Sequence, residues 1–250
     1  MSDFAALSKT LVENLQLALP PVTVALVDER PEGVPAFDGS VPGGCRFWEE
    51  AASRAFVTAT ADHALCAIGV HTHNLAEPTP QSRAELVRVL QVMSDLTYVR
   101  EQDVAQIPRL TREIRYVVYA PLAEAPVTPD VVLLFAHARQ GLIIAEAAQQ
   151  VEQAATPALG RPACAIVPQV VESGRAAVSL GCCGARAYLD HFSDDIALWA
   201  LPGAGIDAYV ERIAALAAAN NTLAAFHRQR RLDVEAGQQP TIDESLARLG

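Results

Sequence analysis

Two kinds of apolar pattern alternate along the chain. In two stretches, residues three or four apart are apolar, which predicts amphipathic helices. These residues are Phe4, Leu7, Leu11 and Leu15 in the first stretch, and Leu86, Leu90, Met93 and Leu96 in the second. Further helices are expected over CRFWEEAASRAF (45–56), DHALCAIG (62–69, ending at Gly69), GLIIAEAAQQVEQA (141–154) and residues 206 to about 231.

Short runs rich in β-branched and aromatic residues separate these helices, and each run predicts a strand. They are VTVALV (22–27), RYVVYAPL (115–122), DVVLLFA (130–136), CAIVP (164–168), RAAVSL (175–180) and IALWALP (196–202). Strands and helices in this proportion are typical of an α/β or α+β fold with a mixed sheet and flanking helices. We expect residues 1–231 to form a single compact domain and residues 232–250 to form a polar, peripheral tail.

The composition and net charge of the chain indicate which classes of binding partner to expect. The chain has 250 residues, of which 51% are hydrophobic, and a formal net charge of −10. That charge repels phosphate backbones and anionic lipids, so nucleic acid and membrane surfaces are not expected partners. The N-terminal segment lacks the apolar core of a signal peptide, and no stretch is long enough to span a bilayer, so we expect a cytoplasmic protein. In a reducing compartment, its five cysteines are expected to be thiols or metal ligands rather than disulfides.

The predicted strands bring two of the cysteines together. Cys164 opens CAIVP and Cys182 follows RAAVSL, and the turn expected at 173–174 leaves a connection too short for a parallel crossover. The two strands should therefore run antiparallel, which places both thiols at the same end of the sheet. The adjacent Cys183 is assigned to packing, because a buried cysteine often behaves as a small apolar residue.

Further candidate residues lie between positions 45 and 73. His63 and Cys66 are three residues apart and share one face if their segment is helical. Cys45 begins the preceding predicted helix, within reach of Cys66 if the two helices form a hairpin. Solvated histidines and structural sulfurs are the simpler interpretation of the same residues. Cys45 and Cys66 are also too far apart in the sequence to match a standard zinc motif.

The order of several segments resembles that of a known family. The segments are PPVTVALV, CRFWEEAASRAFVTATADHALCAIGVHTHN, YVVYAPLAEAPVTPDVVLLFAHARQ and GRPACAIVPQVVESGRAAVSLGCCGARAYLD. Together they are similar to domain of unknown function 169 (DUF169), an uncharacterised archaeal conserved region. The resemblance implies a pattern of widely separated cysteines, matched by Cys45, Cys66, Cys164 and Cys182, with further matches at His63, His73 and Arg186. It implies no agreed activity.

Four thiols from separate segments suit a soft metal, either an iron–sulfur cluster or, as the alternative, zinc. The wide spacing favours a cluster, which we expect to be of the 4Fe–4S type, because structural zinc is usually held by close cysteine pairs. Such a protein would have a redox or small-ligand-binding role, with a small molecule or a redox protein as its partner. His63, His73 and Arg186 are expected to line the approach to the cysteines.

Two other functions fit the same residues. In a metal-free enzyme, Cys66 would be a nucleophile activated by His63 or His73. In a small-molecule binding module, all the cysteines would be structural, and Arg186 would bind an anion through its guanidinium group. Elemental analysis with acid-labile sulfide distinguishes the cluster from zinc and from both metal-free alternatives.

Overall fold

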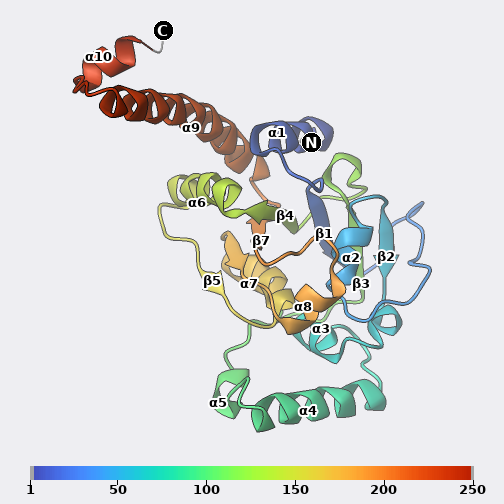
Figure 1. Cartoon of the computed structure of the whole chain (residues 1–250). Helices are drawn as coiled ribbons and strands as arrows, with labels where there is room; N and C mark the ends of the chain where they lie inside the picture. The colour runs from blue at the N-terminus through green and yellow to red at the C-terminus, as the bar shows by residue number, and fades with distance from the viewer. Residues whose placement is uncertain (1–2, 249–250) are drawn as a thin grey trace.

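A seven-stranded mixed sheet crosses the centre of the molecule in the order β2-β3-β1-β4-β7-β6-β5 (Figure 1). This computed structural model describes residues 3–248. The strands are β1 (Val22–Val27), β2 (Phe56–Thr58), β3 (Tyr116–Pro121), β4 (Val131–His137), β5 (Ala158–Leu159), β6 (Ala177–Ser179) and β7 (Ile196–Pro202). Neighbouring strands are antiparallel except β5 and β6, which are parallel. The expected mixed sheet with flanking helices in a single compact domain is confirmed.

Helices cover both faces of the sheet. One face packs against α1 (Phe4–Leu15), α6 (Ala138–Glu152) and α9 (Ile206–Glu235); the other packs against α2 (Arg46–Glu50), α3 (Ala67–Thr72), α7 (Ile166–Ser173) and α8 (Cys183–Tyr188). Strand β4 shows why its sequence is apolar at consecutive positions. Its alternate residues Leu133 and Phe135 pack on the α7 side, whereas Val132 and Leu134 pack on the α6 side, because successive side chains of a strand point to opposite faces.

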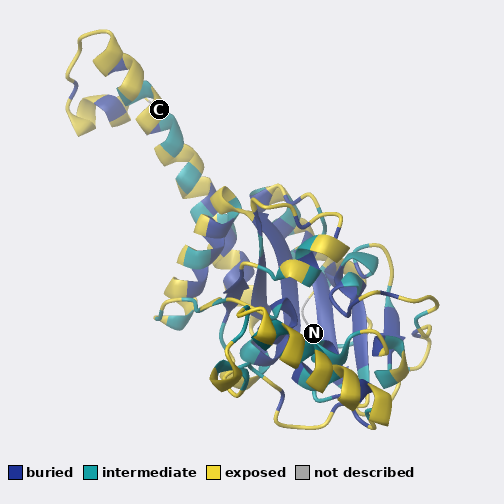
Figure 2. Ribbon diagram, turned by 60° about the horizontal axis from the view of Figure 1, so that its bottom comes forward, coloured by how far each residue is buried: buried dark blue, intermediate teal, exposed yellow. Residues whose placement is uncertain are grey.

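Two parts of the chain lie away from this layered body. Helices α4 (Pro80–Asp95) and α5 (Glu101–Val104) form an outlying segment beside α3 (Figure 1). Ser82 is the one residue that α4 buries. The second half of α9 projects from the body, and α10 (Ile242–Ala247) folds back onto it (Figure 2). Within residues 3–248, no helix combines the length and apolar character needed to cross a membrane.

The strand predicted over CAIVP is wrong. This segment forms a short 3₁₀ helix, η3 (Ala163–Ala165), and the first turn of α7. Ile166, Val167 and Val170 of α7 are buried against the sheet, and a 3.6-residue repeat is what places these three residues on one side. The β-branched residues suggested a strand, but burial of this helical face determines the structure.

Two predicted helices also have different bounds. The helix expected over 45–56 ends at Glu50, and Phe56 instead begins β2. The segment 62–69 is divided between the 3₁₀ helix η1 (Thr60–His63) and α3, so Gly69 lies inside a helix rather than ending one. His63 and Cys66 therefore do not share a regular helix. The remaining 3₁₀ turn is η2 (Leu122–Glu124).

Candidate functional site

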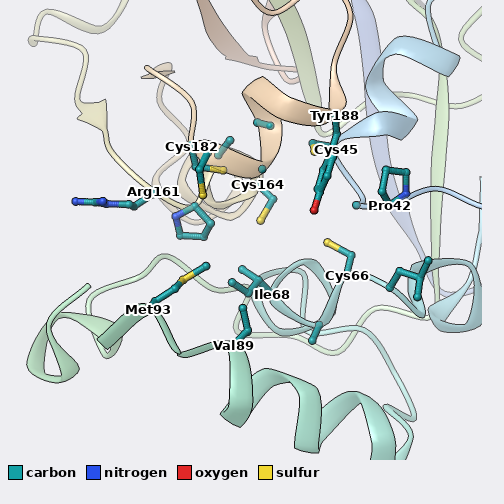
Figure 3. Close-up of a pocket in the computed structure, with 18 of the residues that line it drawn as sticks. Pro42, Cys45, Cys66, Ile68, Val89, Met93, Arg161, Cys164, Cys182 and Tyr188 are labelled. Atoms are coloured by element: carbon teal, nitrogen blue, oxygen red, sulfur yellow. The ribbon is translucent and has the colours of Figure 1, made fainter. Parts of the chain in front are cut away.

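All five cysteines, among them the four that the family resemblance implied, line a single cavity of about 430 Å³ between the body of the protein and α4. Figure 3 shows the side chains of Cys45, Cys66, Cys164 and Cys182 around this space. All four are free thiols. The structure thus brings together the four cysteines that the family resemblance implied.

Each thiol comes from a different segment and lies at or near the start of a helix. Cys45 immediately precedes α2, Cys66 precedes α3 and Cys182 precedes α8, whereas Cys164 is in η3. The expected antiparallel strand pair therefore does not explain why Cys164 lies near Cys182. Instead, η3 and α7 pack on the sheet face that also carries α8, and this packing brings the two residues together.

An ion pair and several hydrogen bonds join the segments of Cys45 and Cys182. Arg46, next to Cys45, contacts Glu49 at 2.5 Å and Asp190 at 2.8 Å. Glu49 also accepts hydrogen bonds from the backbone N–H groups of Asp190 and His191, in the loop after α8. The Glu49 side chain is only 6% exposed, so its charge is satisfied by these donors rather than by water. These contacts fix α2 against α8 and hold one side of the cavity.

Burial keeps three of the four thiols protonated in the absence of a metal. Burial, followed by the nearby Cys66 and Cys182, raises the pKa of Cys45 from 9.0 to about 12. Burial is also the main cause that raises the pKa of Cys164 well above 9.0 and the pKa of Cys66 above that value. Each of these three thiols has at least one other cysteine of the cavity among the causes that raise its pKa, so the thiols lie close enough to interact electrostatically. A bound cation would reverse this balance, because metal coordination stabilises the thiolate.

Two glycines let the backbone approach these sulfurs closely. A Cβ atom added to Gly69, inside α3, would lie 2.8 Å from Sγ of Cys66. A Cβ atom added to Gly44 would lie 3.6 Å from the same Sγ and 3.1 Å from Nδ1 of His63. The backbone of Gly44 and Gly69 also forms hydrogen bonds to Cys66, which lower the pKa of its thiol and oppose part of the effect of burial. The Cys66 sulfur therefore lies in a close-fitting backbone cradle.

The two candidate histidines lie behind the cysteines rather than on the approach to them. His63 and His73 are 1% and 3% exposed. Burial lowers the pKa of His63 to about 3 and that of His73 to about 4, so both imidazoles are neutral at pH 7. Nε2 of His63 is hydrogen-bonded to Thr58, and Nδ1 of His73 is hydrogen-bonded to the carbonyl of Gly69. The second ring nitrogen of each histidine is buried and has no hydrogen-bond partner among the described residues.

Arg186 and Cys183 are not placed as expected. Arg186 donates hydrogen bonds to the carbonyls of Leu180 and Ser193, at 2.5 and 2.7 Å, and its guanidinium lies over the ring of Phe192. Arg186 is absent from the lining of the cavity and instead closes the loop after α8. Cys183 is exposed and contributes to the cavity wall, so its assignment to packing is wrong.

The rest of the cavity wall is largely apolar, and the sequence analysis did not predict that these residues line the site. It includes Ile68, Val89, Leu90, Met93, Val99 and Ile107, several of them from α4. Tyr188 points its hydroxyl into the cavity, and Arg161 lies at its edge (Figure 3). The helical pattern of 86–96 identified α4, but nothing in that pattern indicated that α4 covers the cysteines.

Comparison with known proteins identifies the family. The family model for DUF169, described as an uncharacterised archaeal conserved region (ArCR), matches residues 10–212, which is most of the chain. The chain belongs to the DUF169 family. The matched region contains all four cysteines of the cavity and ends within α9. No curated protein and no solved structure matches the chain. The match therefore identifies the family of this protein but supplies no activity.

The described residues include no preformed site for a single metal ion at the cavity. Among residues 3–248, no group of three or more His, Cys, Asp or Glu side chains is arranged so that it could hold one ion. Tetrahedral zinc needs Zn–S distances of about 2.3 Å, which requires sulfurs close to one another around one point. The cysteines share a cavity without meeting this requirement.

Proposed function

We propose that this DUF169 protein holds an iron–sulfur cluster through Cys45, Cys66, Cys164 and Cys182 and uses it in a redox or small-ligand-binding role. The observation that carries the proposal is the meeting of these four free thiols on one cavity, although they come from four separate segments. Cysteine thiolates are the usual ligands of such clusters. The cavity walls are mainly apolar, which suits a cofactor that must be kept from water.

The surroundings of the thiols fit a cluster in two further respects. The unpartnered nitrogen of His63 lies beside Gly44, next to Cys66, where a bound group with acceptor atoms would satisfy it. Gly69 also leaves no room between its backbone and the Cys66 sulfur, as expected where the chain wraps closely around a bound group. If Cys66 had only a structural role and no group were bound beside it, Nδ1 of His63 would stay buried without a hydrogen-bond partner.

Several sulfurs around one cavity favour a cluster over zinc. A cluster contains several iron atoms and sulfides, so its thiolate ligands surround a larger object than a single ion. This agrees with four thiols that share a cavity of about 430 Å³. When bound, a cluster ligated by four thiolates supplies one-electron transfer. The protein residues would supply the four ligands, exclude water and set the hydrogen bonds around them.

The electrostatics disfavour the alternative of a Cys–His enzyme. A nucleophilic cysteine needs a lowered pKa and a nearby base that accepts its proton. Here burial raises the pKa of Cys66 and lowers that of His63, so the neutral forms of both are favoured. A small-molecule binding module with Arg186 as its anion anchor is also disfavoured, because the guanidinium is used by backbone carbonyls.

Iron and acid-labile sulfide, measured per chain on protein purified without oxygen, test the proposal. The expected result is iron with a similar amount of sulfide in the unmodified chain, and loss of both in Cys164→Ala. Zinc without sulfide would replace the cluster with the zinc alternative. Protein without metal, in which an alkylating reagent modifies Cys66 faster than the exposed Cys183, would instead support the nucleophile.

A further inference from the structure

A polar hollow adjoins the cysteine cavity and shares one wall with it. This second hollow, of about 420 Å³, is lined by Thr97, Arg100, Asp103 and Gly160. Tyr98, Val99, Ile107 and Arg161 line both spaces. The two spaces meet at these four residues; the first is mainly apolar and the second is mainly polar. A ligand occupying both would need an apolar part and a polar part.

Arg161 is the cationic group at this junction that is free to bind an anion. Its guanidinium carbon lies 3.7 Å from the centre of the Tyr98 ring. Among residues 3–248, no carboxylate lies within ion-pair distance of it. A cation–π contact occupies one face of the guanidinium plane and leaves the N–H groups at its edge available. The neighbouring Arg100 is already paired, because it donates to both oxygens of Asp103 at 2.6 and 2.8 Å.

The position of Arg161 is fixed by a chain of contacts to the cysteine loop. The hydroxyl of Tyr98 accepts a hydrogen bond from the backbone N–H of Cys183, at 3.4 Å. The ring that supports Arg161 is thereby connected to the segment that carries Cys182.

The other charged residue on the cavity wall is Glu85, which lies on α4 eight residues before Met93, about 12 Å along the helix. Figure 3 shows Met93 on the same side of the cavity as Arg161.

We infer that the cavity binds a small monocarboxylate with an apolar body, whose carboxylate pairs with Arg161 and whose body lies against α4. The planar guanidinium matches the two oxygens of a carboxylate in a fork. Val89, Leu90, Met93 and Ile68 supply the apolar surface that excludes water from the body of the ligand. Binding by this surface does not depend on the proposed cluster.

Three probes separate the contributions to binding. Hexanoate carries both an apolar chain and a carboxylate, 1-hexanol keeps the chain without the charge, and acetate keeps the charge without the chain. Their dissociation constants are measured by ligand-observed NMR on the full chain. We expect hexanoate to bind about tenfold or more tightly than 1-hexanol, in line with the strength of hydrogen bonds to charged groups. Acetate should bind more weakly than hexanoate.

Two variants assign the difference to Arg161. Arg161→Gln should remove the advantage of hexanoate and leave binding of 1-hexanol unchanged, whereas the control Arg100→Gln should keep the advantage. Equal binding of hexanoate and 1-hexanol by the unmodified chain, or an undiminished advantage in Arg161→Gln, would overturn the inference.

Iron and sulfide are measured on each sample. A protein that holds a cluster but shows no preference for hexanoate contradicts this inference alone. A protein that prefers hexanoate but lacks iron contradicts the proposed function alone.

Discussion

Substitution of Gly69 tests how closely the chain fits the Cys66 sulfur. In Gly69→Ala, the new Cβ would lie 2.8 Å from Sγ of Cys66, whereas ordinary contacts begin at 3.4 Å. The sulfur must therefore move by about 0.6 Å or the helix must shift by a similar distance. Metal–ligand distances tolerate deviations of only about 0.2 Å. We expect Gly69→Ala to lose most of its bound iron.

The same substitution should leave the metal-free protein folded. Gly69 lies inside α3 and has an ordinary helical backbone, so alanine gains up to about 1 kcal/mol of helix propensity. This gain offsets part of the cost of turning the Cys66 side chain. Unfolding in urea, followed by circular dichroism, measures the stability of the metal-free variant, and iron and sulfide per chain measure its cluster.

A matched glycine provides the control for this experiment. Gly160 has no atom within 4 Å of an added Cβ, so Gly160→Ala should retain both its iron and its stability. If Gly69→Ala keeps the full amount of iron while remaining folded, the close fit around Cys66 is irrelevant to metal binding. That result would refute the assignment of Cys66 as a ligand held in this cradle.

Two further predictions concern stability. Glu49→Gln should lower the free energy of unfolding by roughly 1.5–3 kcal/mol, because a buried carboxylate loses its ion pair and charged hydrogen bonds. Urea unfolding measures this change. Glu13 is exposed, so the control Glu13→Gln should show no comparable loss. Metal-free protein should lose stability as the pH falls below 6.5, because unfolding lets His63 and His73 regain the protons that their lowered pKa values exclude in the folded state. Between pH 7 and pH 5 the loss is about 2 kcal/mol for each histidine, and an unchanged pH dependence in His73→Gln would contradict it.

The central strands could be predicted from the sequence because both faces of the sheet are covered. Burial on two sides requires apolar residues at nearly consecutive positions, and VTVALV, which is apolar except at Thr23, shows this pattern over the bounds that β1 has in the structure. CAIVP has a similar composition but is helical. A short apolar run does not distinguish a strand from a buried helical turn, and the packing of Ile166 and Val170 decides between them only in three dimensions.

The cysteines of the candidate site were identified better than their surroundings. The pattern of dispersed cysteines singled out Cys45 and Cys164, but the strand argument gave the wrong reason for the position of Cys164. Arg186 was expected to lie near a ligand, but its guanidinium N–H groups donate to the backbone carbonyls of Leu180 and Ser193. No sequence pattern reveals which carbonyls will accept such hydrogen bonds. Arg161 and Tyr98 carried no signal, because their pairing depends on where the segment after α4 lies against the body.

The adjacent pair Cys182 and Cys183 provides the most direct test of the cluster. Both residues line the cavity, but Cys183 is exposed and is not among the four cysteines implied by the family pattern. Iron and acid-labile sulfide per chain are measured for Cys182→Ala and Cys183→Ala, each purified without oxygen and checked for folding by circular dichroism. The account predicts that Cys183→Ala keeps the cluster of the unmodified chain and that Cys182→Ala loses it. Full retention of iron and sulfide in a folded Cys182→Ala variant would contradict a cluster held by Cys45, Cys66, Cys164 and Cys182.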